Sequence, residues 1–465
     1  MRRSLDDYKF LPLSDAVSAI HQKVNLIGIV SEFSIPKQSR GTDCFCVVKI
    51  VDDSKSSPGI PVNIFAETIE KLPHVQSAGD IILLTRLLIK THGSEVYGVY
   101  HKKFSSFALF EGKHGSSLKP YQFSSTYRAR EEDEIILMEL QKWLLAHPSE
   151  TGSRGSQSLK EISKGEYFNL ACKILHLSEV EKDKPLLFVW DGTDTPPLAI
   201  ETKLEDEREN PLPLQLEPVP LPRDILCSFP AVGTVLRVAI SGANDKLGLN
   251  VIKTGRWFKL VNLKCEYRAG LWCACIMPFT RICYLSDDDE LVLQRLRDYN
   301  ERVSSKWGRM PLSGFPWPSS LTETDHPNVP FVTLMDVLTY PEVTAKFRCV
   351  VRVVSMFPWR AEEFRCPRGT YRITLMLEDP TARLHAFLYA DDATTFFGGY
   401  HPAHVMTRMR NILLGIAESD DGREPVSRNP PWVLCCLKSY YIDKADEWGS
   451  RNYRVFSTKF KGLSS

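Results

Sequence analysis

The first residues suited to chemistry form a short loop of unlike side chains. Ser39, Arg40, Gly41, Thr42 and Asp43 combine a cation, a flexible glycine, and small hydrogen-bond donors and acceptors. A loop of this kind suits close approach to a nucleotide backbone and to a base edge. The same residues are also typical of a solvated turn, and their spacing alone does not separate the two interpretations.

Three further residues could contact unpaired bases. Phe65 ends a strand-like run, and alternation places it on the face opposite to Ile64 if Ile64 points into a core. An aromatic ring on an open face can stack on bases, which contributes about 1 to 3 kcal/mol per base. Arg86 is a lone cation in an apolar run, and its guanidinium could stack on a base or donate to one. Tyr167 opens a later run. A core position is the alternative for Phe65 and Tyr167.

The sequence contains no catalytic constellation. The motifs GxSxG, HExxH and the P-loop are absent, and the histidines are scattered singly. The acidic run from Asp287 to Glu290 could hold a divalent cation, but acids at a helix start are stabilised by the helix dipole and point in different directions. No two of the twelve cysteines form a C-x-x-C pair, so reduced core cysteines are expected. We therefore predict no enzyme activity, no metal site and no cofactor.

The framework that positions these residues is a motif that occurs three times. In each copy an apolar run ends in an acidic turn, and a second apolar run follows that turn. A run of β-forming residues precedes both. The first runs are 46–52, 186–192 and 373–379, and the answering runs are 62–65, 198–200 and 384–389. This order fits a five-stranded Greek-key barrel of the OB type, whose open face suits single-stranded nucleic acid. We predict a mainly β protein with three OB-fold domains and short connecting helices.

Length and composition agree with several globular domains. The chain has 465 residues, of which 43% are hydrophobic and 25% charged, and a single core rarely fills that length. No apolar run approaches the roughly 20 residues that a bilayer span needs, so no membrane association is expected. The formal net charge is +1, so any binding of nucleic acid must depend on a local groove and on stacking.

The domain boundaries follow from helical and loop-like segments. We predict a first OB fold at 1–130, a helix and linker at 131–158, a second OB fold at 159–303, a linker at 304–330 and a third, OB-like domain at 331–465. The second domain is expected to end in a helix from Asp287 to Val303, capped by Ser286. The prolines between 211 and 222 predict one extended loop between strands.

Several segments together resemble the protection-of-telomeres family. In the first domain they are 9–13, 28–30, 41–43, 47–52 and 79–87; in the second, 167–170 and 189–193; in the third, 377–379, 386–388 and 431–440. The resemblance covers nearly the whole chain. Some relatives carry a zinc-bound cysteine quartet in the third domain, of which this chain keeps only Cys366, and its compact form is similar to plant members.

The resemblance implies that the first two barrels bind the single-stranded, G-rich telomeric 3′ overhang and that the third binds a protein partner. Phe65 and Arg86 would contact bases, residues Arg40 to Asp43 would hold the strand, and Tyr167 would stack in the second barrel. Lys37, which stands where the family often has a tyrosine, and Tyr97 complete the predicted nucleic-acid-binding set. Glu32 and Ser34 depart from the family pattern, and a carboxylate in that groove would repel phosphate.

The same resemblance implies a role in telomere protection and telomere-length regulation, in the nucleus at chromosome ends. The expected partners of the third domain are the telomerase ribonucleoprotein or subunits of an OB-fold end-protection complex. One alternative is a telomerase-associated scaffold with weak affinity for DNA. A remote alternative is a metal-dependent nuclease built on OB folds.

Overall fold

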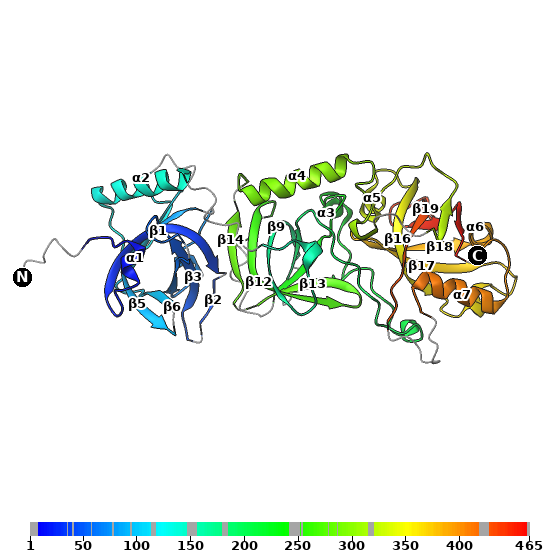
Figure 1. Cartoon of the computed structure of the whole chain (residues 1–465), viewed down its shortest axis with the longest axis horizontal. Helices are drawn as coiled ribbons and strands as arrows, with labels where there is room; N and C mark the ends of the chain where they lie inside the picture. Colours follow the sequence, from blue (N-terminus) through cyan, green and yellow to red (C-terminus); the bar gives the residue numbers. More distant parts are fainter. Residues whose placement is uncertain are drawn as a thin grey trace, which may run out of the picture.

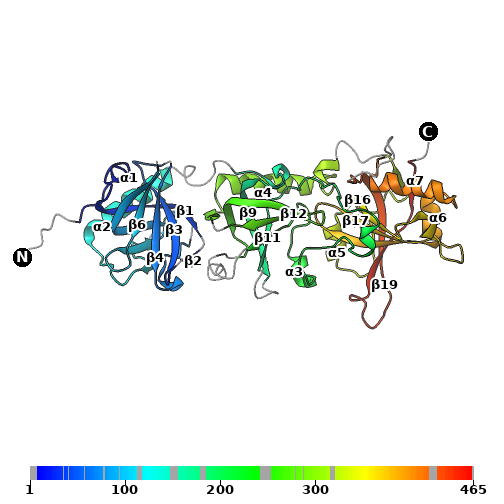
Figure 2. The same cartoon turned by 90° about the horizontal axis from the view of Figure 1, so that it is seen from below.

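Three β-barrels lie in a row, with helices α2 (Glu131–Ala146) and α4 (Glu290–Ser304) on one side of that row (Figure 1, Figure 2). The protein is a mainly β chain of three OB-type barrels, as the sequence predicts. The computed structural model describes residues 8–34, 36–39, 41–56, 58–76, 79–93, 95–112, 118–146, 156–178, 185–240, 252, 254–277, 279–285, 287–314, 320–417 and 427–462.

The first barrel closes because one long strand pairs on both edges. Strand β1 pairs with β3 and with β5, while β4 runs parallel to β6, which is the strand order of an OB fold. Apolar residues alternate along β3 and β4, so one side of each strand fills the barrel and the other side faces outward. The strands are β1 (Lys23–Ser34), β2 (Lys37–Gln38), β3 (Cys44–Val51), β4 (Ile60–Ala66), β5 (Ile81–His92), β6 (Glu95–Tyr100), β7 (Ser106–Phe110) and β8 (Gln122–Phe123).

The second barrel has the same strand order as the first, but the strand that pairs with its acidic-turn strand is not the predicted one. Its strands are β9 (Tyr167–Ser178), β10 (Leu186–Trp190), β11 (Leu236–Ile240), β12 (Trp257–Arg268), β13 (Leu271–Ile276) and β14 (Arg281–Leu285). The partner of β10 is β11, and not the predicted run 198–200. That run is apolar because Ile200 packs against the third barrel, where its backbone bridges Arg428. The proline-rich segment lies between β10 and β11, as expected.

The third barrel closes through five strands and carries two helices of its own. The order β16-β17-β18-β20-β19 is closed, and α6 and α7 lie between β18 and β19 in the sequence. A short strand, β15 (Thr322–Thr324), pairs with β21 (Thr458–Phe460) beside the barrel. The main elements are α5 (Leu334–Thr339), β16 (Lys346–Phe357), β17 (Arg372–Glu378), β18 (Arg383–Tyr389), α6 (Ala390–Phe397), α7 (Ala403–Leu414), β19 (Trp432–Tyr441) and β20 (Arg451–Val455).

The acidic turn of each copy has the same structural role. Asp52, Asp191 and Asp379 are buried, and one carboxylate oxygen of each accepts the backbone N–H of a buried leucine at a short helical turn. These bonds run from Leu13, Leu159 and Leu334 and measure 2.8, 2.9 and 2.7 Å. Each carboxylate therefore fastens the chain that enters a barrel to the strand that ends beside it, which explains why the acidic turn recurs.

The two long helices pack on the barrels that precede them in the sequence. Leu137, Leu140 and Leu144 of α2 join a core with residues of β1, β5 and β7, so this helix covers the first barrel. Helix α4 begins at Glu290, and its N-cap is Asp289, whose side chain accepts the N–H of Leu291. The helix therefore starts three residues later than the predicted Asp287, and its cap is not the predicted Ser286, which lies outside the described residues. The acidic run is thus a helix start, in agreement with the dipole interpretation.

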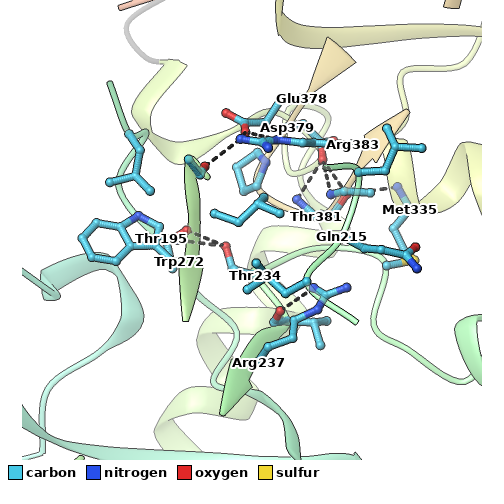
Figure 3. Close-up of a pocket in the computed structure, with 18 of the residues that line it drawn as sticks. Thr195, Gln215, Thr234, Arg237, Trp272, Met335, Glu378, Asp379, Thr381 and Arg383 are labelled. Carbon is cyan, nitrogen blue, oxygen red and sulfur yellow. Dashed lines mark hydrogen bonds and ion pairs between the residues drawn. The ribbon is translucent and has the colours of Figure 1, made fainter. Parts of the chain in front are cut away.

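The second and third barrels are packed into one body by the segment between β10 and β11. Partly buried Glu378 accepts from the buried Arg352 and Arg383. Both arginines also donate to carbonyls of the second unit, Arg352 to Leu198 and Arg383 to Gly270. A cavity of about 140 Å³ remains at this junction, where Figure 3 shows Trp272 and Thr234 opposite Met335 and Arg383. These bonds join the two barrels across the junction, while the third barrel keeps an apolar core of its own.

The side-chain types that bind metals are dispersed over the described part of the chain. No three histidine, cysteine, aspartate or glutamate side chains gather there in a metal-binding group. The twelve cysteines are free thiols, ten of them buried, with Cys227 exposed and Cys366 partly so. Within the same residues no helix has both the length and the apolar character needed to span a membrane.

Candidate nucleic-acid interface

Two aromatic rings form a platform on the outer face of the first barrel. Phe65 on β4 lies directly opposite Phe45 on β3, and their rings stack with centroids 5.6 Å apart and planes 23° apart. Both are half-buried, while their neighbours Cys46 and Ile64 point into the core. The structure therefore places Phe65 on the outer side, where alternation predicts it. Phe45 was not predicted, because its cross-strand partner is visible only once the register is known.

Arg86 is held outward by a bulge in β5. It is exposed and has a left-handed backbone, with φ of +53°, where the pairing of β1 with β5 shifts register. Two polar contacts fix this conformation, since its N–H donates to the Asn25 side chain at 2.9 Å and its carbonyl accepts from Ser105 at 3.0 Å. A non-glycine residue in this region is strained, so the surrounding contacts determine where the guanidinium projects.

The predicted loop is folded tightly at the same end of the barrel. Gly41 and Thr42 are exposed, and Asp43 forms an ion pair with Lys102 at 2.7 Å. The Asp43 carbonyl accepts the N–H of Ser39, which closes the turn. The hydrogen bond to Asp43 raises the pKa of Lys102. Arg40 lies outside the described residues, and Lys37 is placed only by its backbone in β2, opposite Phe45.

Tyr97 lies on the same outer face, but at a distance from Phe65. It belongs to β6, opposite Lys90 of β5, and the register of β4 with β6 places it about four residues along the sheet, roughly 13 Å from the row of Phe65. Sequence reasoning missed another exposed aromatic residue of the first barrel. Phe104 is exposed, stacks on His101 at 4.9 Å and lies 5.4 Å from the Lys23 ammonium. The basic-aromatic run 100–104 was the available signal.

Glu32 does not lie as an uncompensated carboxylate in the groove. It pairs with Lys49 at 3.7 Å and with Arg281 of the second barrel at 2.8 Å. At this point β1 pairs with β14 through two residue pairs, one of them Ser34 with Arg281. The expected repulsion of phosphate is therefore offset by two cations, and the acid serves as part of the contact between the first two barrels.

A second aromatic pair lies beside this contact. Tyr167 at the start of β9 is 50% exposed, and its ring lies 5.4 Å from that of Phe279, which is 52% exposed. Phe279 stands two residues before Arg281, and Lys264 lies opposite Tyr167 on β12. Sequence reasoning found Tyr167 but not Phe279, because the two rings come from segments far apart in the chain. The pair offers a second stacking surface near the end of β1.

In the second barrel the face equivalent to the Phe45 and Phe65 platform is covered. Phe188 on β10 is fully buried and packs on Phe229 at 5.8 Å. Opposite Phe188, Arg237 forms a two-pronged ion pair with buried Glu217 at 3.1 and 3.0 Å. The segment between β10 and β11 supplies both covering residues. Tyr167 and Phe279 of the second barrel, in contrast, lie exposed.

Comparison with known proteins gives matches along the whole chain. A family model described as "Telomeric single stranded DNA binding POT1/CDC13" matches residues 4–154, and one described as "POT1A-like, OB fold domain" matches residues 317–446. Protection of telomeres protein 1b of Arabidopsis thaliana is 42% identical over 455 residues, 97% of this chain and 98% of that protein. Protein 1a of the same plant is 40% identical over 99% of both chains. The human Protection of telomeres protein 1 is 34% identical over 173 residues, 37% of this chain and 26% of the human one.

Proposed function

The chain belongs to the protection-of-telomeres family, as a plant-type member, and on that premise we propose that it binds single-stranded G-rich telomeric DNA through its first two barrels. The role is protection of chromosome ends and regulation of telomere length, in the nucleus at telomeres. The observation that carries the proposal is the stacked pair of Phe45 and Phe65 on the outer face of the first barrel.

The geometry supports a mechanism dominated by stacking. A base that lies flat on Phe65 would extend the stack that Phe45 already forms, and the Arg86 guanidinium at the same end of the sheet can donate to a base edge or stack on it. Gly41 and Thr42 lie exposed in the adjacent loop, where the sugar-phosphate backbone of the DNA can approach closely. Lys102 and Asp43 neutralise each other, so they shape this loop more than they attract phosphate.

The second barrel would receive the continuing strand at Tyr167 and Phe279. The short β1 to β14 pairing brings this pair next to the loop of the first barrel that precedes β3, so one strand can pass from the first platform to the second. The third domain, on this proposal, recruits a protein partner, either telomerase or a subunit of an end-protection complex. No group of metal-binding side chains in the described residues favours the nuclease alternative.

A mobility-shift series with telomeric G-strand and C-strand oligonucleotides tests the proposal. We expect the G-strand to bind more tightly, and a shallow dependence of affinity on salt, because stacking releases no counterions and the chain has a net charge of only +1. Equal affinity for the two strands would refute the sequence preference. Negligible affinity for both, together with co-purification of telomerase activity, would favour the scaffold function instead.

A further inference from the structure

The third barrel repeats two features of the first barrel's candidate site. The tripeptide Arg-Gly-Thr occurs twice in the chain, at 40–42 and at 368–370. Both copies lie in the loop between the first strand of a barrel and the next full strand. In the third barrel this loop is a tight turn, in which Gly369 adopts a φ of +84° and Thr370 accepts the N–H of Cys366 at 2.9 Å. Gly41 does not adopt a positive φ, so the two loops share their sequence and their place in the barrel but not their backbone conformation.

The repeated aspartate gives a common reference for the outer faces of the two barrels. Phe45 stands seven residues before Asp52, and Arg372 stands seven residues before Asp379. The cross-strand partner of Phe45 is Phe65, and the cross-strand partner of Arg372 is Tyr389, which is 45% exposed. An arginine and an aromatic residue therefore occupy the positions of the aromatic platform.

The sheet around this pair continues the same chemistry. One row across four strands consists of Phe357, Thr374, Phe387 and Arg454, which lie opposite one another in register. Phe357 is 59% exposed. A cavity of about 200 Å³ opens beside Phe357 and Thr374, with His385 also in its wall. The row thus contains two aromatic rings and one cation, and a hollow lies at its Phe357 end.

The adjoining loop adds a third ring. Tyr400 is 59% exposed and stacks on buried Tyr371 with centroids 5.3 Å apart and planes 10° apart. The Arg365 guanidinium lies 5.7 Å from the Tyr400 centroid. The stretch 365–372 contains three arginines and no acid. Asp392, which is near this face, is paired with Arg454 at 2.6 Å and with Lys438 at 3.4 Å. The three arginines of this stretch therefore lie beside flat aromatic surfaces, and the acids Glu362 and Glu363 precede the stretch in the same loop.

We propose that this outer face of the third barrel is a further binding site for single-stranded nucleic acid, with Arg372 and Tyr389 at its centre. Unpaired bases stack on Tyr389, Phe357 and Tyr400, and the arginines of the loop contact the phosphates. The inference goes beyond the proposed function, in which the third domain serves a protein partner. A protein on this face would find few exposed aliphatic side chains, whereas rings interleaved with guanidinium groups suit bases and phosphates.

Photo-crosslinking of the full chain to single-stranded oligonucleotides that contain 5-iodouracil tests the site directly. We expect adducts in the third barrel at Tyr389, Phe357 or Tyr400, with DNA, RNA or both, and the two oligonucleotide types show which is preferred. Adducts confined to the first two barrels would overturn the inference. Adducts in the third barrel alone would support it while contradicting the proposed function of the first barrel.

Substitution then measures the contribution to affinity. In a Phe65→Ala background, Arg372→Ala combined with Tyr389→Ala should weaken the remaining binding of a single strand by roughly tenfold, because a base loses its aromatic surface and the strand loses a guanidinium contact. Tyr389→Phe should retain binding because the ring remains. Ile442→Ala, at an exposed site on the loop after β19, is the control and should change nothing. Unchanged affinity in the double variant, with or without loss of a protein partner, would refute the site.

Discussion

Glu32 of the first barrel and Arg281 of the second form an ion pair at 2.8 Å beside the two residue pairs that join β1 to β14. This contact is small compared with the junction of the second and third barrels, where buried arginines and a long segment bond across the boundary. Among the described residues, the second and third barrels are therefore joined by more hydrogen bonds and ion pairs between side chains than the first and second. The ion pair of Glu32 with Arg281 is one of the interactions that hold the first barrel against the second.

Removal of this ion pair should affect the binding of oligonucleotides that contact both barrels and not of those that contact the first barrel alone. We expect Arg281→Gln to leave the affinity for a short oligonucleotide almost unchanged and to weaken a longer one, which reaches Tyr167 and Phe279, by a few-fold. The pair is partly exposed, so its loss should change stability by no more than about 1 kcal/mol. Binding titrations with oligonucleotides of increasing length measure the effect. Arg256→Gln, which breaks an exposed pair with Asp287, is the control, and an equal effect there would contradict the prediction.

The stacking platform makes a prediction about a single ring. Phe65→Ala should weaken binding of the G-rich strand by about 1 to 3 kcal/mol, because a base loses its aromatic surface. Phe65→Tyr should retain most of the affinity. Fluorescence anisotropy with labelled oligonucleotides measures both. Phe123→Ala removes another exposed ring of the same barrel, on β8, and should leave affinity unchanged. If Phe65→Ala and Phe123→Ala bind alike, Phe65 is not a contact residue.

The repeated motif could be predicted from sequence because its parts are local. An apolar run that ends in an aspartate needs only a few neighbouring residues to form, and the aspartate then bonds to the chain entering the barrel. The answering strand of the second barrel could not be found in the same way. Residues 198–200 are apolar because they pack on the third barrel, and a pattern of burial does not tell which neighbour covers it.

The candidate site was partly predictable for the same physical reason. Alternation along one strand is enough to place Phe65 on the outer face. The exposure of Arg86 does not follow from its apolar run alone, because Arg352 in the apolar strand β16 is fully buried. Phe45 and Phe279 could not be predicted as stacking residues, because the ring that each contacts lies far away in the sequence. The pairing of Glu32 with Arg281 spans two domains, so sequence reasoning saw only an acid in the groove.

Arg86 should show a conflict between stability and binding. Its φ of +53° is unfavourable for a residue with a side chain, so Arg86→Gly should stabilise the first barrel by on the order of 1 kcal/mol. The same change removes the guanidinium and should weaken DNA binding. Hydrogen exchange in β5 and oligonucleotide titrations measure the two effects. Asn262→Gly is the matched control, because Asn262 occupies the equivalent bulge of β12 and its N–H donates to Asn169. It should leave short-oligonucleotide affinity intact.

The Asp379 carboxyl predicts an unusual dependence of stability on pH. Desolvation by burial raises the pKa of Asp379 from 3.8 to about 6, although Thr381, Leu334 and Ala382 donate to it. The folded state therefore holds the proton more tightly than the unfolded chain does. As the pH falls from about 6 to about 4, the native protein should gain stability relative to Asp379→Asn, by on the order of 1 kcal/mol per pH unit.

Hydrogen exchange of α5, whose first N–H bonds to this carboxylate, measures the difference between the two proteins at each pH. Asp379→Asn should be less protected throughout, because one of the two acceptor oxygens is replaced by an NH₂ group that cannot accept. The ratio of hydrogen-exchange protection in the native protein to that in Asp379→Asn should increase as the pH falls. Asp391→Asn, at an exposed position in the first turn of α6, is the control and should show a constant ratio. If the ratio for Asp379→Asn decreases as the pH falls, the hydrogen bonds lower the pKa of Asp379 by more than burial raises it.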